Sequence, residues 1–246
     1  MDALTVRHPG ARGRSERRQT CGVTAEHYFS AEPSAPAQRG EIEFSVAGRD
    51  YRLAVASGVF SAGRLDPGTA VLLRKGDLPT AATTGVLLDL GCGYGPIAAV
   101  LATESPQATV WAVDVNSRAR ELAAESPQAT VWAIDVNSRA RELTAENAKT
   151  LGLANLVVAE PDEVPADVVF DQIWSNPPTH VGKAELRALM ARWLPRLAPD
   201  GVAWLVINRN LGGDSLHAWL VELGWHVERM ASQKGYRVLR VGRKTG

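Results

Sequence analysis

The chain has 246 residues, of which 45% are hydrophobic and 22% charged, and its 27 basic and 27 acidic residues leave a formal net charge of zero. This length and apolar content suit one α/β domain with a small appendage. The balanced charge excludes a globally basic nucleic-acid-binding protein, so any contact with nucleic acid has to come from a local patch. Two cysteines exclude a disulfide framework and indicate a reducing compartment. No apolar run approaches the roughly 20 residues of a membrane span, and none forms a signal-peptide core, so we expect a cytoplasmic protein.

The N-terminal part divides into a tail and an extension. Residues 1–26 carry five arginines without apolar periodicity, which predicts a disordered basic tail that is either inert or adds non-specific RNA affinity. Residues 27–80 form an extension that contains a β-hairpin, because apolar residues alternate on both sides of a turn at Ala47-Gly48. The alternating residues are Ile42, Phe44, Val46, Tyr51, Leu53 and Val55.

Residues 81–246 alternate strand and helix patterns, which predicts a doubly wound, mostly parallel sheet with helices on both faces. Amphipathic helices are expected over residues 186–197 and 216–223, with their tryptophans in the core. Residues 202–207, 226–230 and 236–241 have the composition of closing strands.

A glycine-rich segment, Asp89-Leu90-Gly91-Cys92-Gly93-Tyr94-Gly95-Pro96, joins the apolar run 86–88 to the helical run 97–101. Its glycines permit a tight turn and the close approach of a ligand, and Pro96 suits the first position of a helix. It is not a dinucleotide fingerprint, because the third glycine comes one position early, and no phosphate-loop lysine follows. An acid before the first glycine suits a cationic amino-acid group better than a pyrophosphate. Asp89 therefore favours S-adenosylmethionine as the ligand, against a purely structural glycine turn.

A tandem repeat follows this segment. Residues 104–124 recur as residues 125–145 with two changes, Val113 to Ile134 and Ala123 to Thr144. Each copy contains one strand and the start of one amphipathic helix, so each is a complete βα unit. The strand of the first copy ends at Asp114, and that of the second ends at Asp135.

The segment Ser175-Asn176-Pro177-Pro178 follows the apolar run 170–174. Proline fixes its own φ and restricts the residue before it, so Asn176 and the neighbouring carbonyls have little freedom. Carbonyl oxygens held in this way can accept both hydrogens of an exocyclic –NH2 group and direct its lone pair at an electrophile. We therefore predict a catalytic role for Asn176, Pro177 and Pro178, against a simple Pro-Pro turn that ends a strand.

The glycine-rich segment together with Asn-Pro-Pro after a later strand resembles the class I S-adenosylmethionine-dependent methyltransferases that act on amino nitrogens. Further similarity, over residues 27–30, 58–61, 65–69 and 234–240, is to the small-domain methyltransferases related to the small-subunit ribosomal RNA guanine-N2 enzymes. The resemblance covers about residues 27–242. It implies a seven-stranded Rossmann-like methyltransferase sheet with an antiparallel last strand, within residues 81–246.

The resemblance also implies roles for individual residues. Asp89, Gly91, Gly93 and Gly95 would hold the methionine part of S-adenosylmethionine, and Asn176 with the Pro177 carbonyl would hold the target amine. Asp162, with Glu160 as its competitor, would contact the adenine. Asp114 and Asp135 both match the carboxylate that binds the ribose. We favour Asp114, because it lies 19 residues after Gly95, close to the spacing of about 20 expected for the adjacent strand.

The substrate is expected to be the N2 amine of a guanine in small-subunit ribosomal RNA, with ribosomal RNA or the small ribosomal particle as the partner and no metal or membrane involved. The alternatives are protein-glutamine amide methylation and a non-catalytic RNA-binding or ribosome-assembly module. One departure from the base-methylating relatives is Thr179, where they often have an aromatic residue that stacks on a flipped base. Phe60 or Tyr28 would then have to stack. Candidate phosphate contacts are Arg64, Lys183, Lys234 and Arg237, and His180 is a further candidate beside Asn-Pro-Pro.

Overall fold

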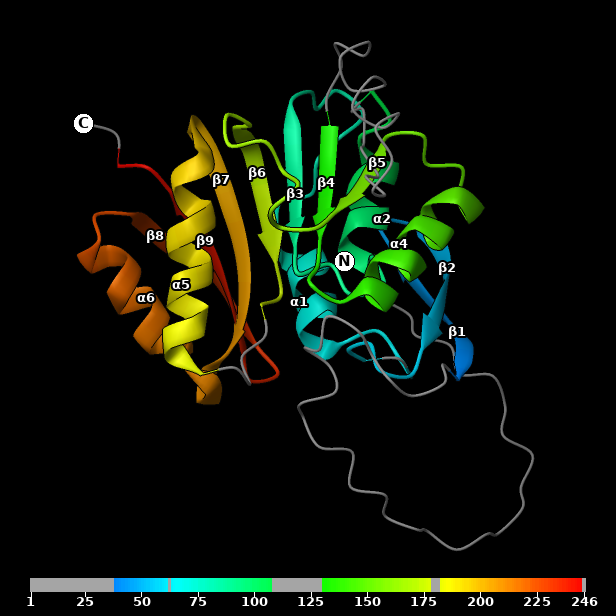
Figure 1. Ribbon diagram of the computed structural model, residues 1–246. Coiled ribbons are helices and arrows are strands. Elements are labelled where there is room, and N and C mark those ends of the chain that lie inside the picture. The colour runs from blue at the N-terminus through cyan, green and yellow to red at the C-terminus, as the bar shows by residue number, and fades with distance from the viewer. Residues whose placement is uncertain (1–37, 62, 108–129, 178–181, 245–246) are drawn as a thin grey trace, which may run out of the picture.

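The computed structural model describes residues 38–61, 63–107, 130–177 and 182–244. Within them, one sheet of seven strands has the order β5-β4-β3-β6-β7-β9-β8, and helices cover both of its faces (Figure 1). The strands β5, β4, β3, β6 and β7 are parallel to one another. Strand β9 lies between β7 and β8 and is antiparallel to both. The predicted Rossmann-like sheet with an antiparallel last strand is therefore confirmed.

The strands of this sheet are β3 (Val86–Leu90), β4 (Thr130–Ile134), β5 (Leu156–Ala159), β6 (Phe170–Ser175), β7 (Leu197–Asn208), β8 (His226–Gln233) and β9 (Tyr236–Gly242). The helices are α1 (Pro67–Lys75), α2 (Pro96–Glu104), α4 (Ser138–Thr150), α5 (Lys183–Trp193) and α6 (Gly213–Glu222), with short 3-10 turns η3 (Leu194–Arg196) and η4 (Arg209–Leu211). None of the described helices combines the length and the apolar character needed to cross a membrane.

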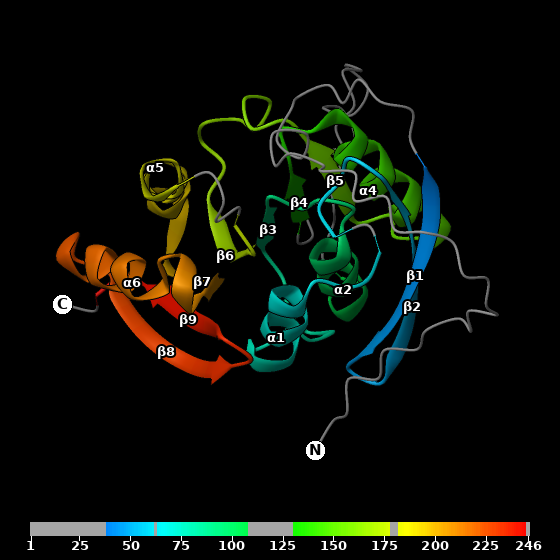
Figure 2. The same ribbon diagram turned by 90° about the horizontal axis from the view of Figure 1, so that it is seen from below.

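Two apolar cores lie on opposite faces of the sheet. Successive side chains of a strand point to opposite faces, so Leu87 packs with α1, α2 and α4, whereas Leu88 and Leu90 pack with α5 and α6. Figure 2 shows these two groups of helices on either side of the strands. Trp193 on α5 is 1% exposed and Trp219 on α6 packs at the edge of the same core. The expectation that the helix tryptophans belong to the core is confirmed.

The N-terminal extension contains the predicted hairpin. Strands β1 (Arg39–Val46) and β2 (Arg49–Ala56) pair antiparallel, and the turn residues Ala47 and Gly48 have φ values of 51° and 75°. Positive φ at both positions is what a two-residue hairpin turn requires. The hairpin lies beside α2 and α4 (Figure 2). Asn147 on α4 joins it to the rest of the molecule, since its Oδ1 accepts from Ala54 N at 2.7 Å and its Nδ2 donates to Ala54 O at 3.0 Å.

The second copy of the tandem repeat, not the first, provides the strand beside β3. Strand β4 pairs with β3 in the register Leu90↔Ile134, and α4 continues that copy into Asn147. Our preference for the first copy at this position is therefore wrong, and Asp114 lies outside the described residues. The physical reason lies in the contacts of α4. Thr144 donates from Oγ1 to Gly93 O at 2.8 Å, and Asn147 donates from Nδ2 to Tyr94 O at 2.8 Å. The residue of the first copy that corresponds to Thr144 is Ala123, and Ser126 stands after the first copy where Asn147 stands after the second, so the first copy cannot make the same bonds.

Candidate active site

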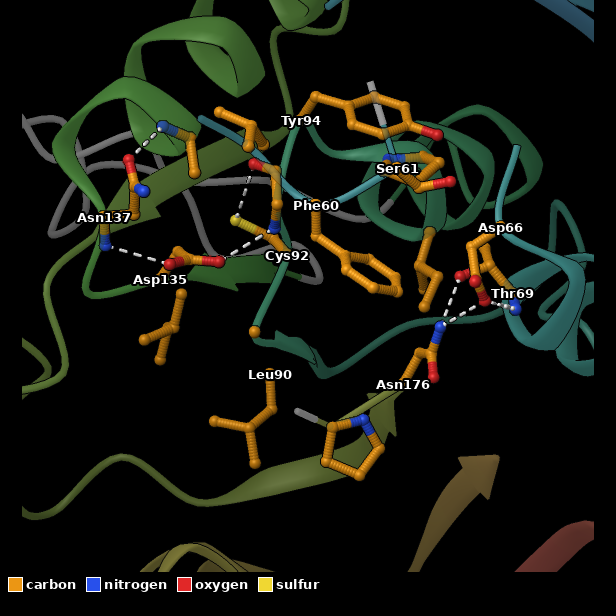
Figure 3. Close-up of a pocket in the computed structure, with 18 of the residues that line it drawn as sticks. Phe60, Ser61, Asp66, Thr69, Leu90, Cys92, Tyr94, Asp135, Asn137 and Asn176 are labelled. Carbon is orange, nitrogen blue, oxygen red and sulfur yellow. Dashed lines mark hydrogen bonds between the residues drawn. The ribbon is translucent and has the colours of Figure 1, made fainter. Parts of the chain in front are cut away.

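The candidate site lies where the strand order reverses, between β3 and β6. The carboxyl ends of these neighbouring parallel strands meet there, and Ser175 Oγ donates to Leu90 O at 2.7 Å. A ligand crevice is expected at such a point in an open α/β sheet. A cavity of about 580 Å³ occupies it, within the size range of small-molecule sites. The glycine-rich segment and Asn176, which are far apart in the sequence, therefore line one cavity (Figure 3).

The glycine-rich segment forms the turn from β3 into α2. Gly91 and Gly93 have φ values of 78° and 59°, and a Cβ atom at either position would meet nothing within 4 Å. Side chains there are excluded by the backbone conformation and not by packing, so the backbone borders open space in which a ligand can approach closely. Pro96 is the first residue of α2, as predicted.

Asp89 is fully buried at the start of this turn. Its Oδ2 accepts from Ala98 N at 2.9 Å, while its Oδ1 is buried without a hydrogen-bond partner among the described residues. Burial raises the pKa of Asp89 to about 8, the Ala98 N–H opposes this shift, and the nearby Asp135 carboxylate adds to it. A buried acceptor next to a second carboxylate is a place where a cationic group is favoured.

Asp135 follows β4 and lies against the glycine turn. Its Oδ2 accepts from Gly93 N at 2.9 Å and its Oδ1 from Asn137 N at 2.9 Å. Burial raises the pKa of Asp135, and these backbone N–H groups oppose the shift. Each carboxylate oxygen can accept more than one hydrogen bond, so both keep capacity for a ligand hydroxyl. Of the two residues predicted for the ribose, the structure thus brings Asp135 to the cavity.

Asn137 and Thr144 support the turn, and our sequence reasoning did not assign them a role. Asn137 caps α4 by accepting from Ala140 N at 3.1 Å, and its Nδ2 donates to Gly58 O at 3.2 Å. Thr144 is fully buried against Gly95, where a Cβ atom would lie 2.7 Å from Thr144 Cγ2. Both this packing and its left-handed φ of 84° require glycine at the third position of the segment. The polar residues at the start of α4 were the available sequence signal.

Asn176 lies at the other end of the cavity. Its Nδ2 donates to Asp66 Oδ1 at 2.7 Å and to Thr69 Oγ1 at 3.0 Å. Both amide hydrogens are therefore engaged, and Figure 3 shows the side-chain oxygen directed away from Asp66 and Thr69. Pro177 also lines the cavity, whereas Pro178 lies outside the described residues. The amide has a defined orientation, and no residue in the described part of the chain donates to its acceptor atom.

Asp66 and Thr69, which hold Asn176, come from the first turn of α1. Asp66 caps this helix through its Oδ1, which accepts from Thr69 N at 2.9 Å. Both residues are buried and both line the cavity. In the sequence, residues 65–69 contributed only to the family resemblance and suggested no role for Asp66 or Thr69. The Asp-Pro pair before an apolar run is a helix-start signal, but nothing in it indicates contact with Asn176.

Aromatic and basic residues lie at the rim. Phe60 is 42% exposed and lines the cavity, as do Tyr236 and Arg64. Lys234 is exposed at the turn between β8 and β9. Arg237 forms an ion pair with Asp214 and its side chain is 12% exposed, and a contact from Arg237 to phosphate stays a prediction. Lys183 is exposed at the start of α5, and Tyr28, Thr179 and His180 lie outside the described residues.

The acids predicted for the adenine form ion pairs near the cavity. Asp162 accepts from Arg192 Nη2 at 2.7 Å, and its side chain is 90% exposed. Glu160 pairs with Arg141. Pro161 between them lines the cavity, as does Arg192. A contact from Asp162 to adenine stays a prediction.

Among solved structures, a T. thermophilus 16S rRNA N2 G1207 methyltransferase in complex with AdoMet and guanosine matches with a TM-score of 0.64 and 24% identity. The match covers 86% of this chain and 52% of that one. A ribosomal protein L11 methylase from Lactobacillus delbrueckii subsp. bulgaricus matches with a TM-score of 0.52 and 18% identity, over 74% of this chain and 85% of that one. Likeness at these identities establishes the shared fold.

Among curated relatives, "Uncharacterized protein YbxB" of Bacillus subtilis is 31% identical over 219 residues, which cover 88% of this chain and 98% of the relative. Ribosomal RNA large subunit methyltransferase G of Streptomyces avermitilis is 35% identical, over 76% of this chain and 44% of the relative. Ribosomal RNA small subunit methyltransferase C of Shewanella loihica is 32% identical, over 76% and 51%. The chain thus spans about half the length of these ribosomal RNA methyltransferases.

A family model described as "Methyltransferase small domain" matches residues 50–126 and 120–240. The two segments overlap at residues 120–126, inside the tandem repeat. Because this model covers most of the chain and YbxB is similar over nearly its whole length, the chain belongs to the methyltransferase small domain family.

Proposed function

We propose that the protein is an S-adenosylmethionine-dependent methyltransferase that modifies the exocyclic N2 amine of a guanine in small-subunit ribosomal RNA. The observation that carries this proposal is the orientation of Asn176, whose amide hydrogens are both held by Asp66 and Thr69 while no described residue donates a hydrogen bond to its oxygen. This is the arrangement that holds a planar amine without a strong base.

The residues at the glycine-turn end of the cavity fit the cofactor. The unpartnered Asp89 Oδ1 suits a cationic amino group, and Gly91 and Gly93 leave room for the methionine part beside them. Asp135 would accept hydrogen bonds from the ribose hydroxyls. When bound, S-adenosylmethionine supplies a methyl group that leaves its bonding electron pair on sulfur, so that the amine nitrogen forms the new bond and loses one proton to water.

Asn176 and Pro177 would act on the substrate amine. Their carbonyl oxygens accept the two amine hydrogens, which keeps the nitrogen lone pair from rotating away from the cofactor end of the cavity. The exposed ring of Phe60 lies in the same cavity (Figure 3) and offers a face for the guanine ring in place of the aromatic residue that Thr179 replaces.

Ribosomal RNA is the proposed substrate because relatives named ribosomal RNA methyltransferases match about three quarters of this chain. Arg64, which lines the cavity, and Lys234, which is exposed at the turn between β8 and β9, would contact phosphates. With a net charge of zero the protein has no strong long-range attraction for naked RNA, so a shaped particle is the better substrate.

The test is methyl transfer to small-subunit particles reconstituted from transcribed RNA, with radiolabelled cofactor and nucleoside mass spectrometry. We expect N2-methylguanosine in the RNA, a lower rate as salt is raised, and no product with Asn176→Ala. Label in protein glutamine instead would refute the RNA substrate in favour of amide methylation. Absence of label from both would refute the proposed function.

A further inference from the structure

We propose that Asp66 selects guanine, by accepting the ring N1–H next to the amine that Asn176 holds. The inference rests on the methyltransferase function proposed above and concerns the choice among substrates. Guanine N2, adenine N6, cytosine N4 and glutamine all carry an –NH2 group that Asn176 and Pro177 could hold. The neighbour of that amine differs between them, and Asp66 is the residue beside Asn176.

The contacts of Asp66 leave one carboxylate oxygen for a ligand. Its Oδ1 accepts from Thr69 N at 2.9 Å and from Asn176 Nδ2 at 2.7 Å. Within the described part of the chain, Oδ2 accepts no hydrogen bond, although Asp66 is 8% exposed and lines the cavity. An ionised carboxylate can only accept. Asp66 Oδ2 and the side-chain oxygen of Asn176 belong to two hydrogen-bonded residues that both line the cavity, and together they form an edge of acceptors, which we call the acceptor edge.

The packing around Asp66 keeps this edge in place. A Cβ atom on Gly68 would lie 2.9 Å from Asp66 Oδ1 and 2.8 Å from Tyr236 Cε1, so no space remains between α1 and the Tyr236 ring. Burial raises the pKa of Tyr236, and the negative charge of Asp66 raises it further. The phenol therefore stays neutral, and the carboxylate is positioned before any substrate arrives.

The acceptor edge matches the hydrogen-bonding pattern of guanine. In guanine the N2 amine adjoins N1–H, so two donors lie side by side. In adenine the amine adjoins the N1 lone pair, in cytosine the N3 lone pair, and in glutamine the carbonyl oxygen, and each of these would face a carboxylate. An unpaired acceptor against a buried acceptor is costly, and sites built to bond an N–H strongly reject analogues that lack it.

Helix capping alone does not require an aspartate. Asparagine and serine cap helices as well as aspartate does, and the oxygen of an asparagine could also accept from Asn176. The two roles therefore give different expectations for Asp66→Asn. If Asp66 only caps α1 and holds Asn176, the substitution leaves base preference unchanged. If it recognises N1–H, the new –NH2 group faces that hydrogen and preference changes.

The experiment compares guanine with 2-aminopurine, which keeps the same amine but has a lone pair at N1. The guanine mapped as the target is replaced by 2-aminopurine in reconstituted small-subunit particles, and kcat/KM is measured for both substrates. For the wild-type protein we expect a preference for guanine of at least tenfold. For Asp66→Asn we expect the guanine to 2-aminopurine ratio to fall at least tenfold. The loss of O6 in 2-aminopurine affects both proteins and cancels from this comparison.

Thr69→Val is the matched control, because it removes one contact to Asn176 and leaves the acceptor edge intact. It should slow transfer to both substrates equally and keep the ratio of the wild-type protein. Asp66→Ser, which retains a capping oxygen, is a second variant in case Asp66→Asn folds poorly. Calorimetric binding of the cofactor verifies that each variant is folded. If the guanine to 2-aminopurine ratio of kcat/KM is the same in the wild-type protein and in the Asp66 variants, the inference is overturned, while the proposed guanine methylation is unaffected. Failure of the wild-type protein to methylate any guanine would overturn the proposed function itself.

Discussion

The Nδ2 atom of Asn176 donates to Asp66 Oδ1 at 2.7 Å, across 110 positions of the chain. This bond joins the end of β6 to the first turn of α1, so a residue of the N-terminal extension sets the orientation of the amide that faces the cavity. The extension is therefore part of the site. It also contributes Phe60, which lines the same cavity.

Asn176→Ala should separate binding from chemistry. Its contact with the amine matters most in the transition state, so turnover should fall by about 100-fold or more while cofactor affinity stays within a few-fold. Steady-state kinetics and calorimetry measure the two quantities. Asp89→Ala is the comparison, because it should weaken cofactor binding itself. An Asn176→Ala protein that no longer binds the cofactor would contradict the assigned role.

Phe60→Leu should weaken substrate binding more than cofactor binding. Loss of stacking on one base costs about 1 to 3 kcal/mol, so KM for the RNA particle should rise by roughly 5-fold to 150-fold. The substitution keeps an apolar side chain at the rim, and the melting temperature should not change. Kinetics at saturating cofactor provide the measurement. An unchanged KM would mean that the ring of Phe60 does not contact the substrate base.

Asp89 should make the stability of the ligand-free protein depend on pH. The pKa of Asp89 is raised from the ordinary value of 3.8 to about 8 in the folded protein. Between these two pH values the folded state therefore holds a proton that the unfolded state has lost. The contribution of this group to the free energy of unfolding is therefore complete below about pH 4 and is lost as the pH rises to about 8.

Urea denaturation between pH 5 and pH 9 measures this dependence. Asp89→Asn should flatten the decline, because the amide does not titrate. Asp200→Asn, at an exposed position on β7, should leave it as in the wild-type protein. If the free energy of unfolding falls with pH equally steeply in the wild-type protein and in Asp89→Asn, Asp89 is ionised in the folded protein.

Substitution of the two repeat acids should have unequal effects. Asp135 accepts from Gly93 N beside the cavity, so Asp135→Ala should weaken cofactor binding by about tenfold or more, in line with the loss of a hydrogen bond to a charged group. Asp114→Ala should leave binding unchanged. Calorimetry with the two variants is a matched test, since both acids occupy the same place in nearly identical segments. A larger effect at Asp114 would mean that the first copy serves the site.

Two deletions test why the second copy lies beside β3. Removal of residues 104–124 and removal of residues 125–145 give chains that differ only in Ile134 and Thr144 against Val113 and Ala123. Ile134 is 1% exposed and Thr144 donates to Gly93 O at 2.8 Å. The chain that keeps Val113 and Ala123 should be less stable by about 1 to 3 kcal/mol. Urea denaturation measures the difference, and equal stabilities would show that neither contact matters.

The sequence alone determined the features that depend on neighbouring residues. Alternation of apolar residues around Ala47-Gly48 is enough for a hairpin, because side-chain direction in a strand has a period of two. The glycine turn before Pro96 and the rigid segment at Asn176 are likewise local consequences of backbone restriction. Their joint occurrence also gave the family resemblance that implied the seven-stranded sheet.

Only the tertiary structure decided between segments with the same local sequence. Both repeat copies have the pattern of a strand and a helix, and the choice between them depends on Thr144 and Asn147, whose partners at Gly93, Ala54 and Tyr94 are distant in the chain. Asp66 is a helix cap by its sequence, and its contact with Asn176 arises from the packing of α1 against the sheet. The sequence around Arg237 shows no partner for its charge, and the fold supplies one, because Asp214 on α6 forms an ion pair with it. Long-range hydrogen bonds and ion pairs of this kind have no periodicity along the chain, so no sequence pattern could reveal them.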